Sequence, residues 1–470
     1  MRSYFFFSVA LAAIVAFNFG LNTVNFSGSK EFAIVDFKWC EGQPSNIVCT
    51  KGDSYGSWIG GGVFWGGAVG SCFIGLLSNY GRRKAMMILH AINIVGSVIS
   101  SAAQCFSMFL LGRFLAGISV GMSGLVAMYL TEICPSDKRG TYGIVYPFFI
   151  TLGQLMMTLW QLLHGRVPTM EEGGKPFEIN GFDRFIWRSA QFWPVVFSVI
   201  ALLILVFVVK DDTPHVLIQE GKDEDAKRVI ALLHGEDKVE SVLAEVRSDQ
   251  EALKASSTTL GIWAALKVPK YRRPLFILFG LSLMQQLSGI NVFVANASKL
   301  FVSIMGRSFL SNIVGSVCVA VLFLSTLGLA FVIDKFGRKT MLLFGIGLSA
   351  AVLVPPVIIK IVAAEADWVK ITLAIGCVGY VAGFAVGLGG IMWLYFAEAL
   401  GSEYKDAGFA TATCLNWVAA GVIVTSSDPL LSWNENFVYS MYAAFTVLGF
   451  FFVLYFIKET KGIPLGQAYA

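Results

Sequence analysis

Long apolar stretches alternate with short polar loops along almost the whole chain. About twelve stretches can be traced, each close to the 20 or so residues that an α-helix needs to cross the hydrocarbon core of a bilayer. They cover residues 4–26, 56–78, 85–106, 109–131, 142–164, 186–209, 274–297, 310–333, 340–363, 369–396, 408–427 and 437–457. The pattern therefore predicts an all-α membrane protein with about twelve spanning helices.

One long charged region interrupts this pattern between the sixth and seventh stretches. It runs from Lys210 to about Arg273, and its charged segment Glu220–Arg228 is followed by apolar residues of Val229–Leu233 at helical spacing. We expect an amphipathic helix with one solvated face here. The predicted organisation is a six-helix bundle at 1–209, a cytosolic helical linker at 210–273, a second six-helix bundle at 274–457 and a short tail at 458–470.

Basic residues in the short loops indicate the orientation. The clusters are Arg82-Arg83-Lys84, Lys138-Arg139 and Lys335/Arg338/Lys339, and all lie on the same side as the linker and both termini. Since basic loops stay in the cytosol, both termini are predicted to be cytosolic. The apolar run that begins at Tyr4 is interpreted as the first spanning helix and not as a cleavable signal peptide. We expect the plasma membrane as the location.

Composition agrees with a membrane protein and excludes a soluble or disordered chain, because 56% of the residues are hydrophobic and only 14% are charged. Six of the eight cysteines lie in apolar runs or at their ends. Cys40 and Cys49 instead lie in the polar loop that is predicted to face outward. A disulfide between them is expected in an oxidising compartment, and two free thiols are the alternative.

Two pairs of loops repeat between the halves of the chain. Ser78–Lys84, after the second stretch, matches Asp334–Lys339, after the eighth. In the loops after the fourth and tenth stretches, an acidic residue precedes a basic one by seven positions: Glu132 precedes Arg139, and Glu398 precedes Lys405. Two matching halves indicate a duplicated carrier with its binding site at the interface between them.

Seven motifs in order resemble the sugar-porter family of the major facilitator superfamily over the whole chain. They are Gly112–Gly117, Glu132–Gly140, Gln285–Asn291, Asp334–Lys339, Trp393–Glu398, Asn416-Trp417 and Glu459–Gly462. The chain resembles the facilitative glucose and hexose transporters of this family, and the resemblance implies the major facilitator fold. It also implies facilitated transport of a monosaccharide, with glucose or another hexose expected, by alternating access.

The polar residues of the seventh stretch are the predicted centre of the sugar site. Gln285, Gln286 and Asn291 offer neutral donors and acceptors that can replace the water lost by sugar hydroxyls. Hydrogen bonding between helices is the alternative role. In an ideal helix Gln285 and Gln286 point about 100° apart, and Asn291 lies about 120° from Gln285 on the other side. We therefore predict that the helix is broken at Ser288-Gly289.

Further sugar contacts are implied by the resemblance. Trp393 matches the tryptophan that lies against the sugar, although a membrane-interface anchor is an alternative role. Phe384 matches a family aromatic residue, Asn416 and Trp417 match a polar–aromatic pair, and Thr23 is a further candidate.

The chain departs from the family pattern at several site positions. Pro147 replaces the sugar-binding Gln of the fifth helix. Gln154, seven residues further on, keeps the same face within about 20° and lies about 10 Å along the axis, so it is a candidate contact. In the eighth helix, Leu322 stands where the family has an asparagine. Ala295-Asn296 replaces the pair of tyrosines that closes the outer gate in the seventh helix, and Gly387–Met392 replaces the proline-rich run before Trp393. They leave the identity of the sugar open.

Coupling to protons is expected to be absent. Proton-coupled relatives carry an Asp at the position of Asn22, near the arginine that matches Arg113. Asn22 cannot take up and release a proton, and the acidic residues Glu132, Asp334 and Glu398 lie at predicted cytosolic ends. Facilitated diffusion is therefore predicted.

The cytosolic charges resemble a network that joins the halves when the carrier faces outward. Its members are Arg82, Arg83, Glu132, Arg139, Asp334, Arg338, Lys339, Glu398 and Lys405. Ion pairs that break and re-form in each cycle serve as a latch between two states of similar energy. Charges that only set the topology are the alternative.

The sequence leaves three alternatives to a hexose uniporter. A proton-coupled carrier and a polyol or inositol carrier differ in coupling or substrate, whereas a non-transporting sugar sensor belongs to another class. We find no nucleophile–base pair, metal-ligand spacing or phosphate loop, so no enzyme activity, cofactor, metal or nucleic-acid partner is expected. The expected partners are a sugar and the lipid bilayer, and a monomer is sufficient. The sequons at Asn25 and Asn296 are expected to be chance matches.

Overall fold

The computed structural model describes residues 2–39, 50–78, 80–134, 142–166, 178–255, 261–295, 309–333, 335–363, 367–401, 404–463 and 469. Every regular element in these ranges is helical, as the apolar pattern predicts. Cys40, Cys49, Arg139, Asp334 and Asn296 lie outside the described residues.

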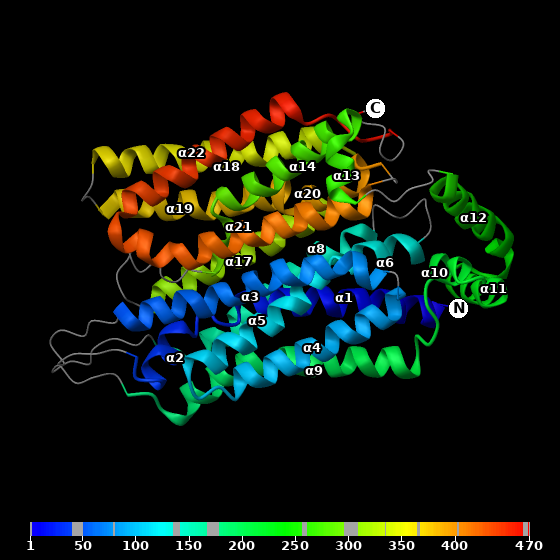
Figure 1. The fold of residues 1–470 in the computed structure, drawn as a ribbon. Helices are drawn as coiled ribbons and strands as arrows, with labels where there is room; N and C mark the ends of the chain where they lie inside the picture. The colour runs from blue at the N-terminus through cyan, green and yellow to red at the C-terminus, as the bar shows by residue number, and fades with distance from the viewer. Residues whose placement is uncertain are drawn as a thin grey trace.

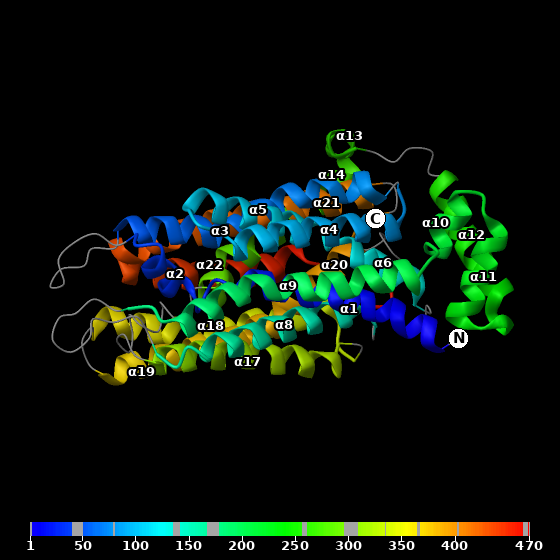
Figure 2. The same cartoon turned by 90° about the horizontal axis from the view of Figure 1, so that it is seen from below.

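Long helices run side by side through the molecule, and both termini lie at one end of it (Figures 1 and 2). The first half contains α1 (Arg2–Val24), α2 (Lys30–Asp36), α3 (Thr50–Ser78), α4 (Arg82–Ser101), α5 (Phe106–Met122), α6 (Leu125–Ile133), α8 (Val145–Leu162) and α9 (Gly181–Phe207). The second half contains α14 (Pro269–Leu287), α15 (Ile290–Ala295), α17 (Phe309–Ala330), α18 (Arg338–Val362), α19 (Asp367–Phe384), a π-helix (Ala385–Gly389), α20 (Gly390–Ala399), α21 (Lys405–Trp433) and α22 (Glu435–Phe456).

The region between the halves forms short helices at the end of the bundle that also holds the termini (Figure 1). They are α10 (Pro214–Gln219), α11 (Asp223–His234), the 3-10 helix Glu236–Lys238, α12 (Val239–Ala255) and α13 (Ile262–Lys267). The predicted amphipathic helix is α11, which buries Val229, Ile230 and Leu233. We call this end of the bundle the charged end, and the other the distal end.

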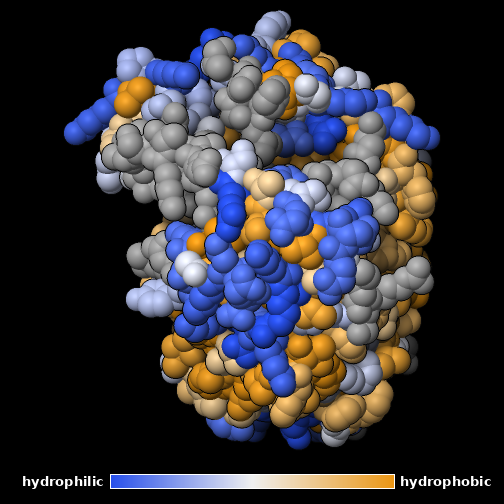
Figure 3. Space-filling model, turned by 90° about the vertical axis from the view of Figure 1, so that its right-hand side faces the viewer, coloured by the Kyte–Doolittle hydropathy of each residue, from blue (hydrophilic) through white to orange (hydrophobic). Residues whose placement is uncertain are grey.

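The surface of the bundle suits a lipid environment. Within the described ranges, nine helices are long and apolar enough to cross a membrane, and α5 is a shorter apolar helix. Large apolar side chains such as Leu203 and Phe207 on α9 and Ile361 on α18 point outward. Figure 3 shows hydrophilic residues gathered on the charged end and hydrophobic residues along the flanks. The chain is therefore an integral membrane protein.

Helix α3 joins the two halves because its glycines allow close approach on two sides. A Cβ at Gly66 would lie 2.0 Å from the carbonyl oxygen of Phe114 on α5, in the same half. A Cβ at Gly67 would lie 2.8 Å from the ring of Trp417 on α21, in the other half. Both distances are shorter than the contacts that Cβ atoms make, so only glycine fits at these two positions. The close approach at Gly67 places Trp417 at the interface between the halves.

The fourth and tenth stretches are less regular than expected. The helix of the fourth is interrupted at Ser123-Gly124, between α5 and α6, and that of the tenth contains the π-helix Ala385–Gly389. Short π-helical segments are rare and occur frequently at functional sites.

Candidate functional site

The predicted break in the seventh stretch is present. Helix α14 ends at Leu287, Gly289 has a φ of 90°, and α15 begins at Ile290. A Cβ at Gly289 would lie 2.6 Å from the ring of Tyr442, which adds a steric reason for glycine to its positive φ. The Tyr380 hydroxyl donates to the carbonyl oxygen of Ser288 at 2.8 Å, which satisfies a backbone group that the break leaves without a helical partner.

The break brings together four amide side chains. Asn291 Nδ2 donates to Gln286 Oε1 at 2.5 Å, and Gln286 Nε2 donates to Asn416 Oδ1 at 2.9 Å. Asn416 Nδ2 in turn donates to Gln285 Oε1 at 2.7 Å. Gln285 Nε2 donates to the carbonyl oxygen of Leu388 in the π-helix at 3.1 Å. We call Gln285, Gln286, Asn291 and Asn416 the amide cluster. It provides neutral donors and acceptors from three elements of the second half.

An aromatic cavity lies between the amide cluster and the charged end. It encloses about 380 Å³ including its mouth, and both halves contribute to its wall. Trp393, Trp417 and Thr413 come from the second half, and Phe19 and Tyr146 from the first. Trp417 packs edge-on against Phe19 with centroids 5.5 Å apart. The half-buried Trp393 therefore lines the interior of the bundle and does not have the position of a membrane-interface anchor.

Gln154 and Thr23 form a pair in the first half. Gln154 Nε2 donates to Thr23 Oγ1 at 3.2 Å, so the glutamine that follows Pro147 on α8 reaches the first helix. Phe384 lies elsewhere: it is buried in the core of the second half beside Tyr380, at a centroid distance of 6.4 Å. The residues lining the aromatic cavity do not include Phe384.

Arg113 is held by neutral oxygen atoms in the first half. Its Nη1 donates to the backbone oxygen of Asn22 at 2.8 Å and to the side chain of Asn25. The Asn22 side chain instead donates to Asn93 Oδ1 at 3.0 Å. Asn25 is thus a partner of Arg113 that sequence reasoning missed. Because Asn25 is 1% exposed and contacts Arg113, its sequon is not an accessible glycosylation site.

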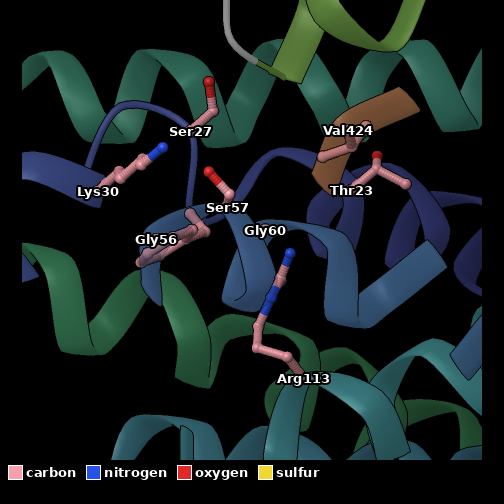
Figure 4. Close-up of a pocket in the computed structure, with 9 residues that line it drawn as sticks. Thr23, Ser27, Lys30, Gly56, Ser57, Gly60, Arg113 and Val424 are labelled. Atoms are coloured by element: carbon pink, nitrogen blue, oxygen red, sulfur yellow. The ribbon is translucent and has the colours of Figure 1, made fainter. Parts of the chain in front are cut away.

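An ion pair joins the halves near the distal end. Lys30, the first residue of α2, pairs with Asp428 on α21, and Ser57 Oγ donates to Asp428 Oδ2 at 2.5 Å. Nearby, Trp65 Nε1 on α3 donates to Thr425 Oγ1 on α21 at 3.1 Å. Lys30 and Ser57 line a small cavity with Thr23, Ser27 and Arg113 (Figure 4).

Asp428 corrects the expectation that the spanning segments hold acidic residues only at one end. The predicted eleventh stretch stops at residue 427, but α21 continues to Trp433 through Pro429, and Asp428 is 2% exposed. Burial of a carboxylate is costly unless it is paired, and Lys30 provides the pairing. The apolar residues that follow Asp428, up to Trp433, could have indicated from the sequence that this helix continues past residue 427.

The charges of the first half form a clamp at the charged end. Arg82 Nη2 and Nε donate to Glu132 Oε1 at 2.7 and 3.0 Å. Asp212, which follows α9, accepts from the backbone N–H groups of Arg82 and Arg83, and Thr213 Oγ1 donates to Glu132. Burial raises the pKa of the Asp212 carboxyl. The clamp thus joins residues of α4 and α6 to the segment that follows α9.

The second half repeats this clamp. Arg338 Nη2 donates to Glu398 Oε1 at 2.8 Å, and Thr460 Oγ1 donates to Glu398 Oε2 at 2.5 Å. Glu459 accepts from the backbone N–H groups of Arg338 and Lys339. Burial alone would raise the pKa of Glu459, but its backbone donors outweigh burial and lower it.

Both clamp ion pairs, Arg82–Glu132 and Arg338–Glu398, join residues of a single half. A latch that joins the two halves at this end therefore stays a prediction. Lys405, another member of the predicted latch, is the first residue of α21. Asp212 and Thr213 were missed by the sequence analysis. The sequence feature that could have identified them is an acidic residue followed by threonine after the last helix of each half, Asp212-Thr213 and Glu459-Thr460.

Comparisons with known proteins agree with this architecture. The family model described as "Sugar (and other) transporter" matches residues 8–469. Hexose transporter 1 of Plasmodium falciparum is 32% identical over 463 residues, which cover 98% of this chain and 91% of the relative. The facilitated glucose transporter member 3 of Oryctolagus cuniculus is 27% identical over 474 residues, which cover 98% and 90%.

A solved structure shares the fold. The major facilitator proton:xylose symporter XylE bound to 6-bromo-6-deoxy-D-glucose superposes with a TM-score of 0.78 at 21% identity, covering 99% of this chain and 98% of that one. The chain therefore has the fold of the major facilitator proteins. The chain belongs to the sugar transporter family, and its relatives are transporters and not enzymes.

Proposed function

We propose that this chain carries a hexose across the membrane by facilitated diffusion, binding it at the amide cluster. The observation that carries the proposal is the convergence of Gln285, Gln286, Asn291 and Asn416 at a broken helix beside a cavity between the halves. Hexose transporters among the relatives support this choice of sugar.

The amide cluster suits a sugar because its hydrogen bonds can be exchanged. Each carboxamide both donates and accepts, so a sugar hydroxyl can replace a neighbouring amide without leaving a buried polar group unpaired. Trp393 and Trp417 add flat apolar faces for the C–H groups of the ring. Gln154 and Thr23 supply polar contacts from the first half in place of the glutamine lost at Pro147.

Proton coupling is the second candidate, and Asp428 is the observation that favours it. An intramembrane carboxylate can carry a proton. Against it, Asp428 is paired with Lys30 across the two halves, and Asn22 has no proton to exchange. We therefore favour uniport.

The proposed orientation places the charged end in the cytosol of a plasma-membrane protein, because the basic loops lie there. Alternating access requires contacts between the halves that open in turn at each end. Lys30–Asp428 supplies such a contact at the distal end, which is then extracellular. The clamps keep each half together at the other end.

The proposal is tested by uptake of radiolabelled D-glucose into liposomes that contain the purified protein. We expect equilibration without accumulation, competition by other hexoses, and no effect of an imposed pH gradient. Accumulation driven by the pH gradient would establish symport through a titrating group. Competition by polyols alone would indicate a polyol carrier, and absence of all uptake would indicate a sensor.

Neutralising Glu398 should bias the carrier toward the inward-facing state. The predicted latch gives Glu398 a contact with the other half only in the outward-facing state, so Glu398→Gln weakens that state alone. A loss of about 1 kcal/mol then shifts the two-state population by about fivefold. The ratio of inside to outside labelling of an introduced cysteine measures this shift. An unchanged ratio would count against a role of Glu398 in the latch, and Glu240→Gln, in the linker, is the matched control.

A further inference from the structure

A second polar cavity lies nearer the distal end, between α8 of the first half and α17 of the second. It encloses about 340 Å³, a volume that includes the open solvent at its mouth. Its polar side chains are Ser27, Thr158, Gln161, Asn312 and Ser316. We call it the distal cavity. None of the described residues that line it is charged.

Gln161 fixes one wall of the distal cavity. Its Oε1 accepts from the backbone N–H of Gly28 at 2.7 Å, and its Nε2 donates to the carbonyl oxygen of Val24 at 3.0 Å. These two bonds hold the chain where α1 ends, which places Ser27 and Gly28 at the cavity. Gln161 is therefore a positioning residue for this wall.

The opposite wall provides an available amide. Ser316 Oγ donates to the backbone oxygen of Asn312 at 2.8 Å. In the described part of the chain, no residue forms a hydrogen bond with the Asn312 carboxamide, which lines the cavity. Thr158 Oγ1 donates to the backbone oxygen of Gln154 at 2.7 Å and retains acceptor capacity.

A polar path leads inward from the distal cavity. Gln161 follows Gln154 by seven residues, so both lie on one face of α8, about 10 Å apart along its axis. Gln154 bonds to Thr23, which lines the cavity of Figure 4, and Ser27 lines both that cavity and the distal cavity. Polar side chains inside a membrane protein usually mark a substrate pathway.

We propose that the distal cavity is a second hexose-binding subsite, which the sugar occupies between the extracellular side and the amide cluster. The inference rests on the proposed function. Neutral hydroxyls and amides from both halves match the donor and acceptor pattern of a sugar, as they do in the amide cluster. The absence of charge among the described lining residues disfavours an anion or a cation as the ligand.

Equilibrium binding of radiolabelled D-glucose to the purified protein tests the subsite. Gln285→Ala disables the amide cluster, and this variant should retain weak, saturable binding that unlabelled D-glucose displaces and L-glucose does not. Adding Asn312→Leu should lower the remaining affinity by about tenfold or more, because Ser27 and Thr158 then face an apolar group. Ser325→Leu, on the same helix but outside the cavity lining, is the matched control.

Two outcomes would overturn the subsite. Gln285→Ala with a wild-type melting temperature but no glucose binding would leave the amide cluster as the single site. Undiminished binding in Gln285→Ala/Asn312→Leu would place the second site elsewhere. Failure of the proposed function differs from both, because the wild-type protein would then neither bind nor transport a hexose.

Discussion

Gln285→Ala should remove most hexose uptake while leaving the protein folded. Gln285 Oε1 accepts from both Asn416 and Gln286, and its Nε2 donates to the carbonyl oxygen of Leu388. Unpaired buried polar groups cost about 1–3 kcal/mol each, so the expected loss of uptake at low sugar concentration is about tenfold to a hundredfold. Initial rates of radiolabelled glucose uptake into liposomes measure it.

The matched control for Gln285→Ala is Gln104→Ala. Gln104 is exposed after α4, and its Nε2 donates to the carbonyl oxygen of Ala102 in the same loop at 3.3 Å. It should transport like the wild type at equal protein density. Near-normal uptake by Gln285→Ala, measured in the same liposomes, would refute the assignment of the amide cluster as the sugar site.

Asp428→Asn should also reduce transport strongly, because it leaves the buried Lys30 without its carboxylate partner. Removal of one partner from a buried ion pair costs about 3–5 kcal/mol. Since the pair joins the halves, the cost falls on the state in which the distal end is closed. We expect more than a tenfold loss of uptake and a lower melting temperature in detergent.

A double variant distinguishes the effect of an unpaired buried charge from the effect of losing the Lys30–Asp428 ion pair. Lys30→Met with Asp428→Leu replaces the pair by apolar side chains, which is often neutral for stability, so it should recover much of the melting temperature. Asp223→Asn, which removes the exposed pair with Arg247 in the linker, should change neither quantity measurably. Wild-type transport by Asp428→Asn would show that the cycle does not depend on this pair.

The fold was predictable because lipid imposes a strong constraint on sequence. Each apolar stretch had to be a helix to satisfy its backbone, so the spans could be located from hydropathy. The break at Ser288-Gly289 followed from a local argument, since Gln285, Gln286 and Asn291 cannot converge on an unbroken helix. Gly289 then adopts the positive φ that this break requires.

The contacts that were missed all depend on partners distant in sequence. Asp428 resembles a loop residue until Lys30, 398 positions away, is placed beside it. Asn25 resembles a glycosylation site until Arg113 is seen to donate to it. Similarly, Asp212 becomes part of a clamp only when α9 returns to the loop that precedes α4. Hydropathy and spacing report the local environment, but they do not report which helices become neighbours.

The two clamps have a mechanical consequence. Each one joins three helix ends of a single half through Glu132 and Asp212 or through Glu398 and Glu459, so we expect each half to rotate as a stiff body. Helices about 30 Å long then act as lever arms around the contact of α3 with α21. When the distal ends of the two halves move apart and separate Lys30 from Asp428, the charged ends of the two halves therefore move toward each other.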